Sequence, residues 1–375
     1  MNHRSFRCAL MLAGIVVTAA VRPDPVRADA QVDAAKAATE ARLKRISAEL
    51  FSGAATSDAA IRELKQILAI DPRAADAHLL LGIAYRAQGS QEFTGEAVAE
   101  FRQALALNPS LVPARVYLAQ AYGDLGRHDR AHQELEAALL QMPGSPQVMA
   151  LLGNVERQLK NPRRAMELIG QALAADPSFA QARYYLGLAL LDLGQRDDAI
   201  RELERVRQSG AKVADVYLAL GSAYSEAGRF EEAVETLSQA TQIDSVRPDV
   251  RILLARAYRS TGKLDQAELQ LKYAVPERAT TLLAAQYVEF DLYLEWGLLR
   301  LQQGRHEAAV DAFKKALDLD PNHGPANRGI AEVYLAQGLY ALSSRHASLA
   351  EKLGFPLPEA KRALLKEKLR GKGAT

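Results

Sequence analysis

The sequence predicts an all-α protein built as a solenoid of two-helix units, and three observations predict it. Five stretches of the chain align without gaps at a period of 34 residues. Within each stretch apolar residues recur at helical spacing, and the same two positions always hold small residues. Hydrophobic residues make up 49% of the chain and aromatic residues only 6%, which favours helices packed through small contacts over a β-sandwich.

The repeat is visible in two columns of residues that lie one period apart. Stacked supersecondary units show such self-similarity because a single unit cannot bury its apolar face alone. The columns are Leu118, Leu152, Leu186, Leu220 and Leu254, and Ala131, Ala165, Ala199, Ala233 and Ala267.

Each unit is predicted to hold two helices separated by a glycine. In the fifth unit Leu186 and Gly187 share one face of the first helix, and Gly194 is placed to end that helix in the left-handed conformation. The second helix begins with acidic residues, which the helix dipole favours there. Its apolar face includes Ala199 and Leu203.

The small residues predict how the two helices pack. Across nine units the place of Gly187 holds only Gly or Ala, and the place of Ala199 holds only Ala or, in the last unit, Ser343. Gly inside a helix costs about 0.5–1 kcal/mol relative to Ala, so a recurring glycine needs a compensating reason. Close approach of the two helices supplies that reason. It predicts that Gly187→Leu overpacks the contact and destabilises the array by about 1–3 kcal/mol.

The pattern resembles the tetratricopeptide repeat, with its signature W-x2-L-G-x2-Y…A-x3-F…P. The segments 217–240 (YLALGSAYSEAGRFEEAVETLSQA) and 294–321 match it closely, and the resemblance covers about residues 41–357. It implies antiparallel helix pairs stacked into a right-handed superhelix. It also implies a concave groove lined by the first helix of each pair.

Residues 1–30 are expected to be a secretory signal peptide. Arg4 and Arg7 precede an apolar run of 13 residues, and a small-x-small exit follows at 28–30. We expect cleavage after residue 30; a cut at Ala20 and a retained membrane anchor are the alternatives. The run is short of the roughly 20 residues that span a bilayer. The mature chain is therefore expected to be an exported bacterial protein, periplasmic or secreted.

The array of about nine repeats is assigned to residues 31–357. Its first and last units fit worst, as terminal repeats usually do. The unit boundaries are 41–74, 75–111, 112–145, 146–179, 180–213, 214–247, 248–289, 290–323 and 324–357.

Two units and the C-terminal segment depart from the period. The second unit has three extra residues around 90–96, which we expect in its internal turn. The seventh has eight extra residues around 279–290, and we expect the next first helix to start early; a partner contact, a dimer contact and a neutral insertion remain open. Residues 358–375 are expected to form a capping helix and basic tail, with a docking tail as the alternative. The side chains expected to face inward are Ala360, Leu364, Leu365 and Leu369.

Composition and motifs argue against several classes of function. The only cysteine, Cys8, lies in the expected signal, so disulfides and Cys-ligated zinc are not expected in the mature chain. Beyond residue 30 the chain has 43 basic and 43 acidic residues, which disfavours nucleic acid as the main partner.

Phosphate-loop, GxSxG and HExxH motifs are lacking. His128 and His132 lie one turn apart without a third ligand, so we interpret them as solvated or structural. No enzyme activity, metal or cofactor is expected.

Candidate partner-binding residues follow from the resemblance. In this family the concave side is formed by first-helix residues three before, one after and four after the column glycine. The candidates are Gln120, Asn154, Arg157, Tyr184, Leu188, Leu191, Ser222, Arg256 and Arg259. The same rule also gives Val116, Gly123, Ala150, Leu218, Ser225 and Ile252. Some of these residues are alternatively expected to pack between helices and never meet a partner.

The sequence thus predicts a non-enzymatic scaffold or adaptor of the bacterial cell envelope, which binds a partner peptide or helix in the concave groove. Tyr and Arg beside apolar residues are enriched at protein interfaces. Asn154 is preceded one turn earlier by Ala150 rather than Lys, which argues against a clamp for the acidic C-terminus of chaperones. The alternatives are a self-associating structural component or homo-oligomer, and a glycan- or cell-wall-binding accessory protein of an export system.

Overall fold

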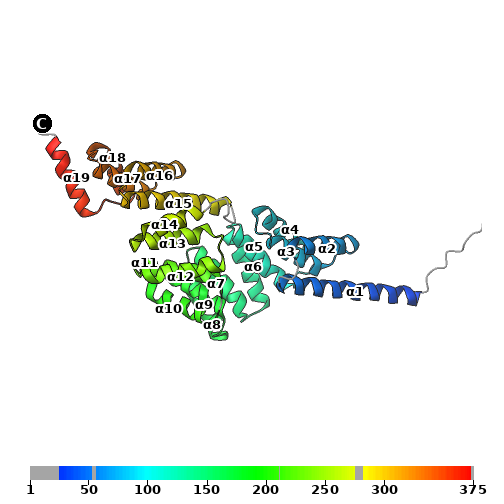
Figure 1. The fold of residues 1–375 in the computed structure, drawn as a ribbon. Helices are drawn as coiled ribbons and strands as arrows, with labels where there is room; N and C mark the ends of the chain where they lie inside the picture. Colours follow the sequence, from blue (N-terminus) through cyan, green and yellow to red (C-terminus); the bar gives the residue numbers. More distant parts are fainter. Residues whose placement is uncertain (1–24, 53–55, 211, 275–281, 373–375) are drawn as a thin grey trace, which may run out of the picture. The chain divides into compact units, whose positions relative to one another are not determined.

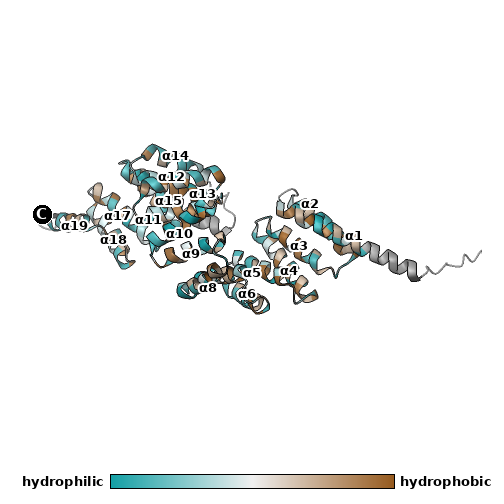
Figure 2. Cartoon of the chain, turned by 90° about the horizontal axis from the view of Figure 1, so that it is seen from below, coloured by the Kyte–Doolittle hydropathy of each residue, from teal (hydrophilic) through white to brown (hydrophobic). Residues whose placement is uncertain are grey.

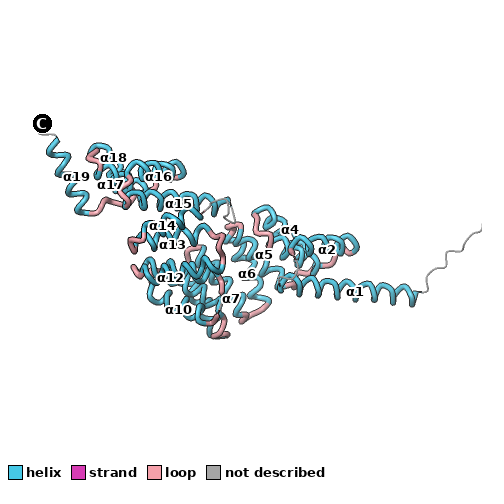
Figure 3. Tube along the Cα trace, in the orientation of Figure 1, coloured by secondary structure: helices cyan, strands magenta, loops and turns pink. Residues whose placement is uncertain are grey.

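The computed structural model describes residues 25–52, 56–210, 212–274 and 282–372. Contacts divide the chain into two compact units, 1–56 and 57–375. Throughout the described ranges every regular element is a helix (Figure 1, Figure 3), which confirms the predicted all-α class.

The helices are numbered α1 to α19 in chain order. They are α1 (Pro25–Ser52), α2 (Ser57–Ile70), α3 (Ala75–Arg86), α4 (Gln91–Leu107), α5 (Val112–Asp124), α6 (His128–Gln141), α7 (Pro146–Gln158), α8 (Pro162–Ala175), α9 (Ala180–Asp192), α10 (Arg196–Gln208), α11 (Ala214–Glu226), α12 (Phe230–Ile243), α13 (Pro248–Ser260), α14 (Leu264–Tyr273), α15 (Leu282–Gln302), α16 (His306–Leu319), α17 (Gly324–Ala336), α18 (Tyr340–Lys352) and α19 (Glu359–Lys372).

From α3 onward the helices pack in successive pairs. The first helix of a pair contacts the second most extensively, and the second then packs against the first helix of the next pair. Figure 2 shows hydrophilic and hydrophobic residues mixed on the same helices, as expected of helices that bury one face. The predicted solenoid of stacked helix pairs is therefore observed.

The expected signal peptide falls almost wholly on residues 1–24, which lie outside the described residues. Helix α1 begins at Pro25 and continues through the expected cleavage site to Ser52. Among the described residues, no helix combines the length and apolar character needed to cross a membrane.

The column glycines lie where the two helices of a pair approach most closely. A Cβ on Gly187 would lie 2.7 Å from Cγ of Leu203, and one on Gly221 would lie 2.5 Å from Cγ of Leu237. Both leucines belong to the second helix of the same pair and are fully buried. Tight contact with this side chain explains why the column accepts only small residues.

The turn inside most pairs places one residue in the left-handed region. Gly194 and Gly228 have φ of 71° and 74°, as predicted for glycines that end the first helix. The equivalent residue between α7 and α8 is Lys160, with φ of 65°, and Lys160 alone among non-glycine residues in the described ranges has a positive φ. A Cβ makes this conformation costly.

The two longer units lengthen helices rather than turns. Helix α4 has 17 residues, and the Ser90 side chain caps it by accepting a 3.2 Å hydrogen bond from the Phe93 N–H. The prediction that the extra residues at 90–96 lie in a turn is therefore wrong, because Ser90 starts the helix early. The early start of α15 is confirmed, since this helix has 21 residues and begins at Leu282.

Helix α19 packs over the end of the array through a small contact. Leu365 and Leu357 are buried in one cluster with Ala331 and Leu335. Of the side chains expected to face inward, Leu365 does so, whereas Leu364 and Leu369 are exposed, as is Ala360. The apolar stripe on α19 is thus narrower than the sequence pattern predicts.

Candidate partner-binding surface

The nine candidate residues all lie on first helices and are all partly exposed. They come from α5, α7, α9, α11 and α13. The same spacing rule fails at Val116, Ala150 and Ile252, which are buried in the core. The position three before the column glycine therefore packs between helices in three of the five units, as the alternative expectation allowed.

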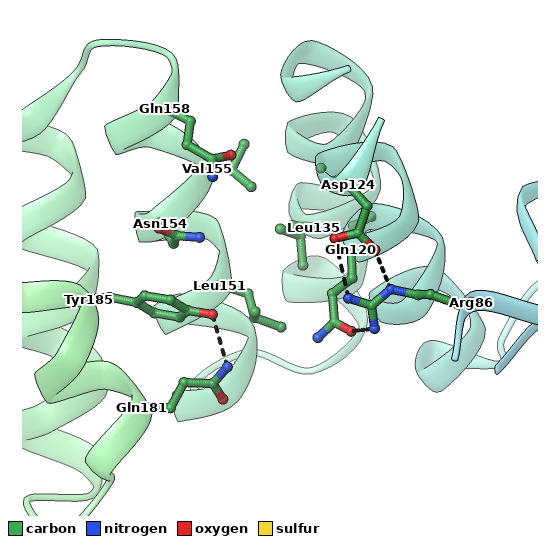
Figure 4. Close-up of a pocket in the computed structure, with 12 residues that line it drawn as sticks. Arg86, Gln120, Asp124, Leu135, Leu151, Asn154, Val155, Gln158, Gln181 and Tyr185 are labelled. Carbon is green, nitrogen blue, oxygen red and sulfur yellow. Dashed lines mark hydrogen bonds and ion pairs between the residues drawn. The ribbon is translucent and has the colours of Figure 1, made fainter. Parts of the chain in front are cut away.

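Two candidates, Gln120 and Asn154, meet at a pocket of about 380 Å³ between the first helices (Figure 4). Its polar groups come from α3, α5, α7 and α9, and its apolar groups include Leu135 of α6. The lining residues are Arg86, Ala119, Gln120, Gly123, Asp124, Leu135, Leu151, Asn154, Val155, Gln158, Gln181 and Tyr185.

Arg86 joins α3 to α5 at one side of the pocket. Its Nε donates to Asp124 Oδ2 at 2.6 Å, and its Nη1 donates to Gln120 Oε1 at 2.9 Å. The guanidinium charge is thus neutralised by a carboxylate of the next unit.

Arg157 makes the equivalent connection between α7 and α9. Its Nη1 donates to Asp192 Oδ2 at 3.0 Å, and its Nε donates to Asn154 Oδ1 at 3.2 Å. Arg86 and Arg157 both lie four residues after the column glycine, and each binds a carboxylate at the end of the next first helix. Two repeats therefore use the same ion pair between neighbouring units.

An apolar set continues the surface on α9. Tyr184, Leu188 and Leu191 are partly buried, and together with Leu218 they pack against the core between α9 and α13. Burial is the main cause that raises the pKa of Tyr184 to about 12, so its hydroxyl stays protonated at neutral pH. These side chains stabilise the stack and still expose part of their surface.

Arg256 and Arg259 form ion pairs within the protein. Their Nε atoms donate to Glu295 Oε1 and Oε2 at 2.6 and 3.1 Å. The Glu295 side chain is only 3% exposed, so both arginines compensate a buried carboxylate. A role for them in partner binding stays a prediction, as it does for Ser222 on α11.

The two histidines do not assemble a metal site. His132 Nε2 lies 3.1 Å from Glu156 Oε1, and His132 Nδ1 lies 3.5 Å from Glu136. Within the part of the chain that the structure describes, no three His, Cys, Asp or Glu side chains are grouped to hold a metal ion.

Sequence reasoning missed five polar residues that line the pocket, one of which is Asp124. Arg86 lies four residues after Gly82, and the spacing rule would have found it if the rule had been applied to the second unit. Gln158, Gln181 and Tyr185 lie at positions outside the rule, and nothing in a single repeat marks them. Gln158 of α7 joins Gln181 and Tyr185 of α9 in the pocket only when the two helices stack.

Two sequence models of the tetratricopeptide repeat match the chain. One matches residues 94–155, 224–286 and 300–345, and the other matches 47–112, 150–214 and 186–248. Together the matches cover most of the chain. No curated protein sequence matches it.

Three solved structures are similar in fold. The APC/C hetero-tetramer Cut9–Hcn1 aligns with a TM-score of 0.64 and 17% identity over 82% of this chain, which spans 59% of that chain. A tetratricopeptide repeat protein from Parabacteroides merdae aligns with a TM-score of 0.53, 16% identity and coverages of 68% and 98%. PilF of Pseudomonas aeruginosa aligns with a TM-score of 0.50, 19% identity and coverages of 59% and 97%. At these identities the similarity concerns the fold alone.

Proposed function

This chain belongs to the tetratricopeptide repeat family, and from that premise we propose that it is a non-enzymatic scaffold or adaptor of the bacterial cell envelope. Proteins of this family generally mediate protein–protein interactions, and their fold is typically a scaffold without catalytic activity. One of the similar structures, Cut9–Hcn1, is itself a hetero-tetramer, which supports a protein partner here.

The observation that carries the proposal is the surface formed by α5, α7, α9, α11 and α13. It combines a polar pocket at Gln120 and Asn154 with partly exposed apolar side chains at Tyr184, Leu188 and Leu191. A peptide or helix needs both kinds of contact, because apolar burial gives affinity and hydrogen bonds give orientation. The proposed partner lies along this surface.

A cross-linked pull-down from the native host tests the surface. The variant Leu191→Lys/Ser222→Lys places two long charged side chains on it, and circular dichroism checks that the variant is folded. Leu140→Lys is the matched control, because Leu140 lies on the second helix α6 and is 83% exposed. We expect wild type and the control to capture the same proteins and the double variant to lose them. If the double variant still captures these proteins, the binding site lies elsewhere on the chain.

The envelope location is a separate part of the proposal, supported by the N-terminal sequence pattern at 1–30. Cell fractionation and mass spectrometry of the mature N-terminus test it. We expect a periplasmic or secreted protein that begins at Gln31. A cytoplasmic protein with an intact N-terminus would remove the envelope role and leave the scaffold function untouched.

Size measurements at several protein concentrations test self-association. A strict monomer would exclude the homo-oligomer, whereas a size that grows with concentration would favour the self-associating structural component.

A further inference from the structure

The pocket lies where Gly123 leaves space in α5. The equivalent position of other first helices carries a side chain, as in Arg86, Arg157 and Leu191. A Cβ built on Gly123 meets no atom within 4 Å, so this glycine, unlike Gly187, is not required by a tight helix contact. Glycine also lowers helix propensity. Gly123 thus contributes neither packing nor helix stability. What its missing side chain does is leave the pocket open.

Two amide groups in the pocket are oriented by arginines. Gln120 Oε1 accepts from Arg86 Nη1 at 2.9 Å, and Asn154 Oδ1 accepts from Arg157 Nε at 3.2 Å. Each bond turns the amide oxygen toward an arginine and therefore turns the NH2 group away. In Figure 4 both NH2 groups point into the space between the helices. Across the described residues neither nitrogen has a hydrogen-bond acceptor.

Helix α9 offers one acceptor and one donor to the pocket. Gln181 Nε2 donates to the Tyr185 hydroxyl oxygen at 2.9 Å. This bond leaves Gln181 Oε1 able to accept and the Tyr185 O–H able to donate. The pocket therefore presents NH2 donors on α5 and α7, an acceptor and an O–H donor on α9, and the paired carboxylate of Asp124.

The charges around the pocket limit which ligands can enter it. Arg86 is already paired with Asp124 at 2.6 Å, so a carboxylate ligand would approach Asp124 without gaining an unpaired cation. A cationic ligand would face the NH2 donors of Gln120 and Asn154. An apolar ligand would desolvate these donors without pairing them, which is unfavourable. A neutral primary amide carries both complementary groups: a C=O that accepts from the Gln120 or Asn154 NH2 group, and an NH2 group that donates to Gln181.

We propose that this pocket binds the side-chain amide of an Asn or Gln residue in an extended peptide of the partner protein. The inference rests on the proposed function and names one group that the partner carries. Helix α9 holds Tyr185 in the pocket and also the partly exposed Tyr184 and Leu188. A peptide that leaves the pocket along α9 therefore meets apolar surface, which favours a peptide over a sugar.

Selection from a random dodecapeptide display library on the full chain tests this proposal. We expect enriched peptides to share Asn or Gln at one aligned position. The variant Gly123→Leu fills the pocket, and we expect it to bind an enriched peptide at least about tenfold more weakly. Gly170→Leu is the matched control, because Gly170 lies in α8 and a Cβ there also meets nothing within 4 Å; it should bind like wild type.

The outcomes separate the two proposals. Enriched peptides without an Asn or Gln preference, or a preference that persists in Gly123→Leu, would overturn the pocket assignment and leave the scaffold function standing. Failure to enrich any peptide would also overturn the pocket assignment, whereas the scaffold function, whose partner can be a helix, is decided by the pull-down. Binding of chitotriose that Gly123→Leu abolishes would assign the pocket to the acetamido group of a glycan instead.

Discussion

Glu295 of α15 accepts a 2.6 Å hydrogen bond from Arg256 of α13, although the Glu295 side chain is almost fully buried. Arg259 donates to the other carboxylate oxygen. These pairs join α15 to the preceding first helix at the unit where eight extra residues interrupt the period. They add to the apolar core that α15 forms with α13 and α14.

The Glu295 pairs predict an asymmetric response to mutation. Arg256→Ala/Arg259→Ala leaves a buried carboxylate without a cation and should cost about 3–5 kcal/mol. Glu295→Gln leaves two partly exposed arginines that water can reach, and it should cost less, about 1.5–3 kcal/mol. Urea denaturation of the three proteins measures both values. Equal losses, or a larger loss for Glu295→Gln, would contradict this account.

Gly187 and Gly123 predict opposite effects for the same substitution to Ala. Gly187→Ala brings a Cβ to 2.7 Å from Leu203 Cγ and should destabilise the array, and Gly187→Leu should cost about 1–3 kcal/mol. Gly123→Ala meets open space and should stabilise α5 by about 0.5–1 kcal/mol. Melting temperatures of the three variants test the pair, and a gain in stability at Gly187 would exclude the close contact.

The positive φ of Lys160 predicts that one substitution at this residue stabilises the protein. Its φ of 65° is one that an L-residue adopts at a cost. Lys160→Gly removes the Cβ and should therefore raise the free energy of unfolding by about 1 kcal/mol. The reverse change at the equivalent turn, Gly194→Lys, should lower it. Differential scanning calorimetry compares them, and a destabilised Lys160→Gly would show that the lysine side chain makes a compensating contact.

Glu268 predicts a loss of stability in acid. Hydrogen bonds, first from Arg300 and then from Gln303 and Lys272, lower the pKa of its carboxyl to about 2 from an ordinary 4.5. Because the folded-state pKa is the lower one, the unfolded chain binds the proton first as pH falls. The Glu268 contribution is complete above about pH 4.5 and is lost between 4.5 and 2. The stability of Glu268→Gln should fall less steeply over this window in denaturation at a series of pH values; an identical slope would contradict the prediction.

The fold was predictable because the 34-residue period repeats the same residue types at the same helix contact in every unit. Gly187 and Ala199 mark the same helix contact that Gly153 and Ala165 mark one unit earlier, and the structure places each glycine against a buried side chain of its partner helix. The turn glycines are predictable for the same reason.

The binding surface was less predictable because it depends on contacts between units. The spacing rule identified Gln120 and Asn154, but Gln181 and Tyr185 reach the same pocket from a different register. Arg256 and Arg259 also follow the rule, yet Glu295 binds them, and no period relates that glutamate to its partners. Pairing between side chains of neighbouring units is a property of the stack rather than of one repeat.

The ion pairs of α15 affect how the array resists a pulling force. Each unit of a solenoid contacts only its neighbours, so a pulling force between the two ends passes in series through every junction. At α15 that junction holds Glu295 with its two arginines, and also Arg300, whose Nη1 and Nη2 both donate to Glu268. In a single-molecule stretching experiment the units on either side of α15 should therefore be among the last to separate.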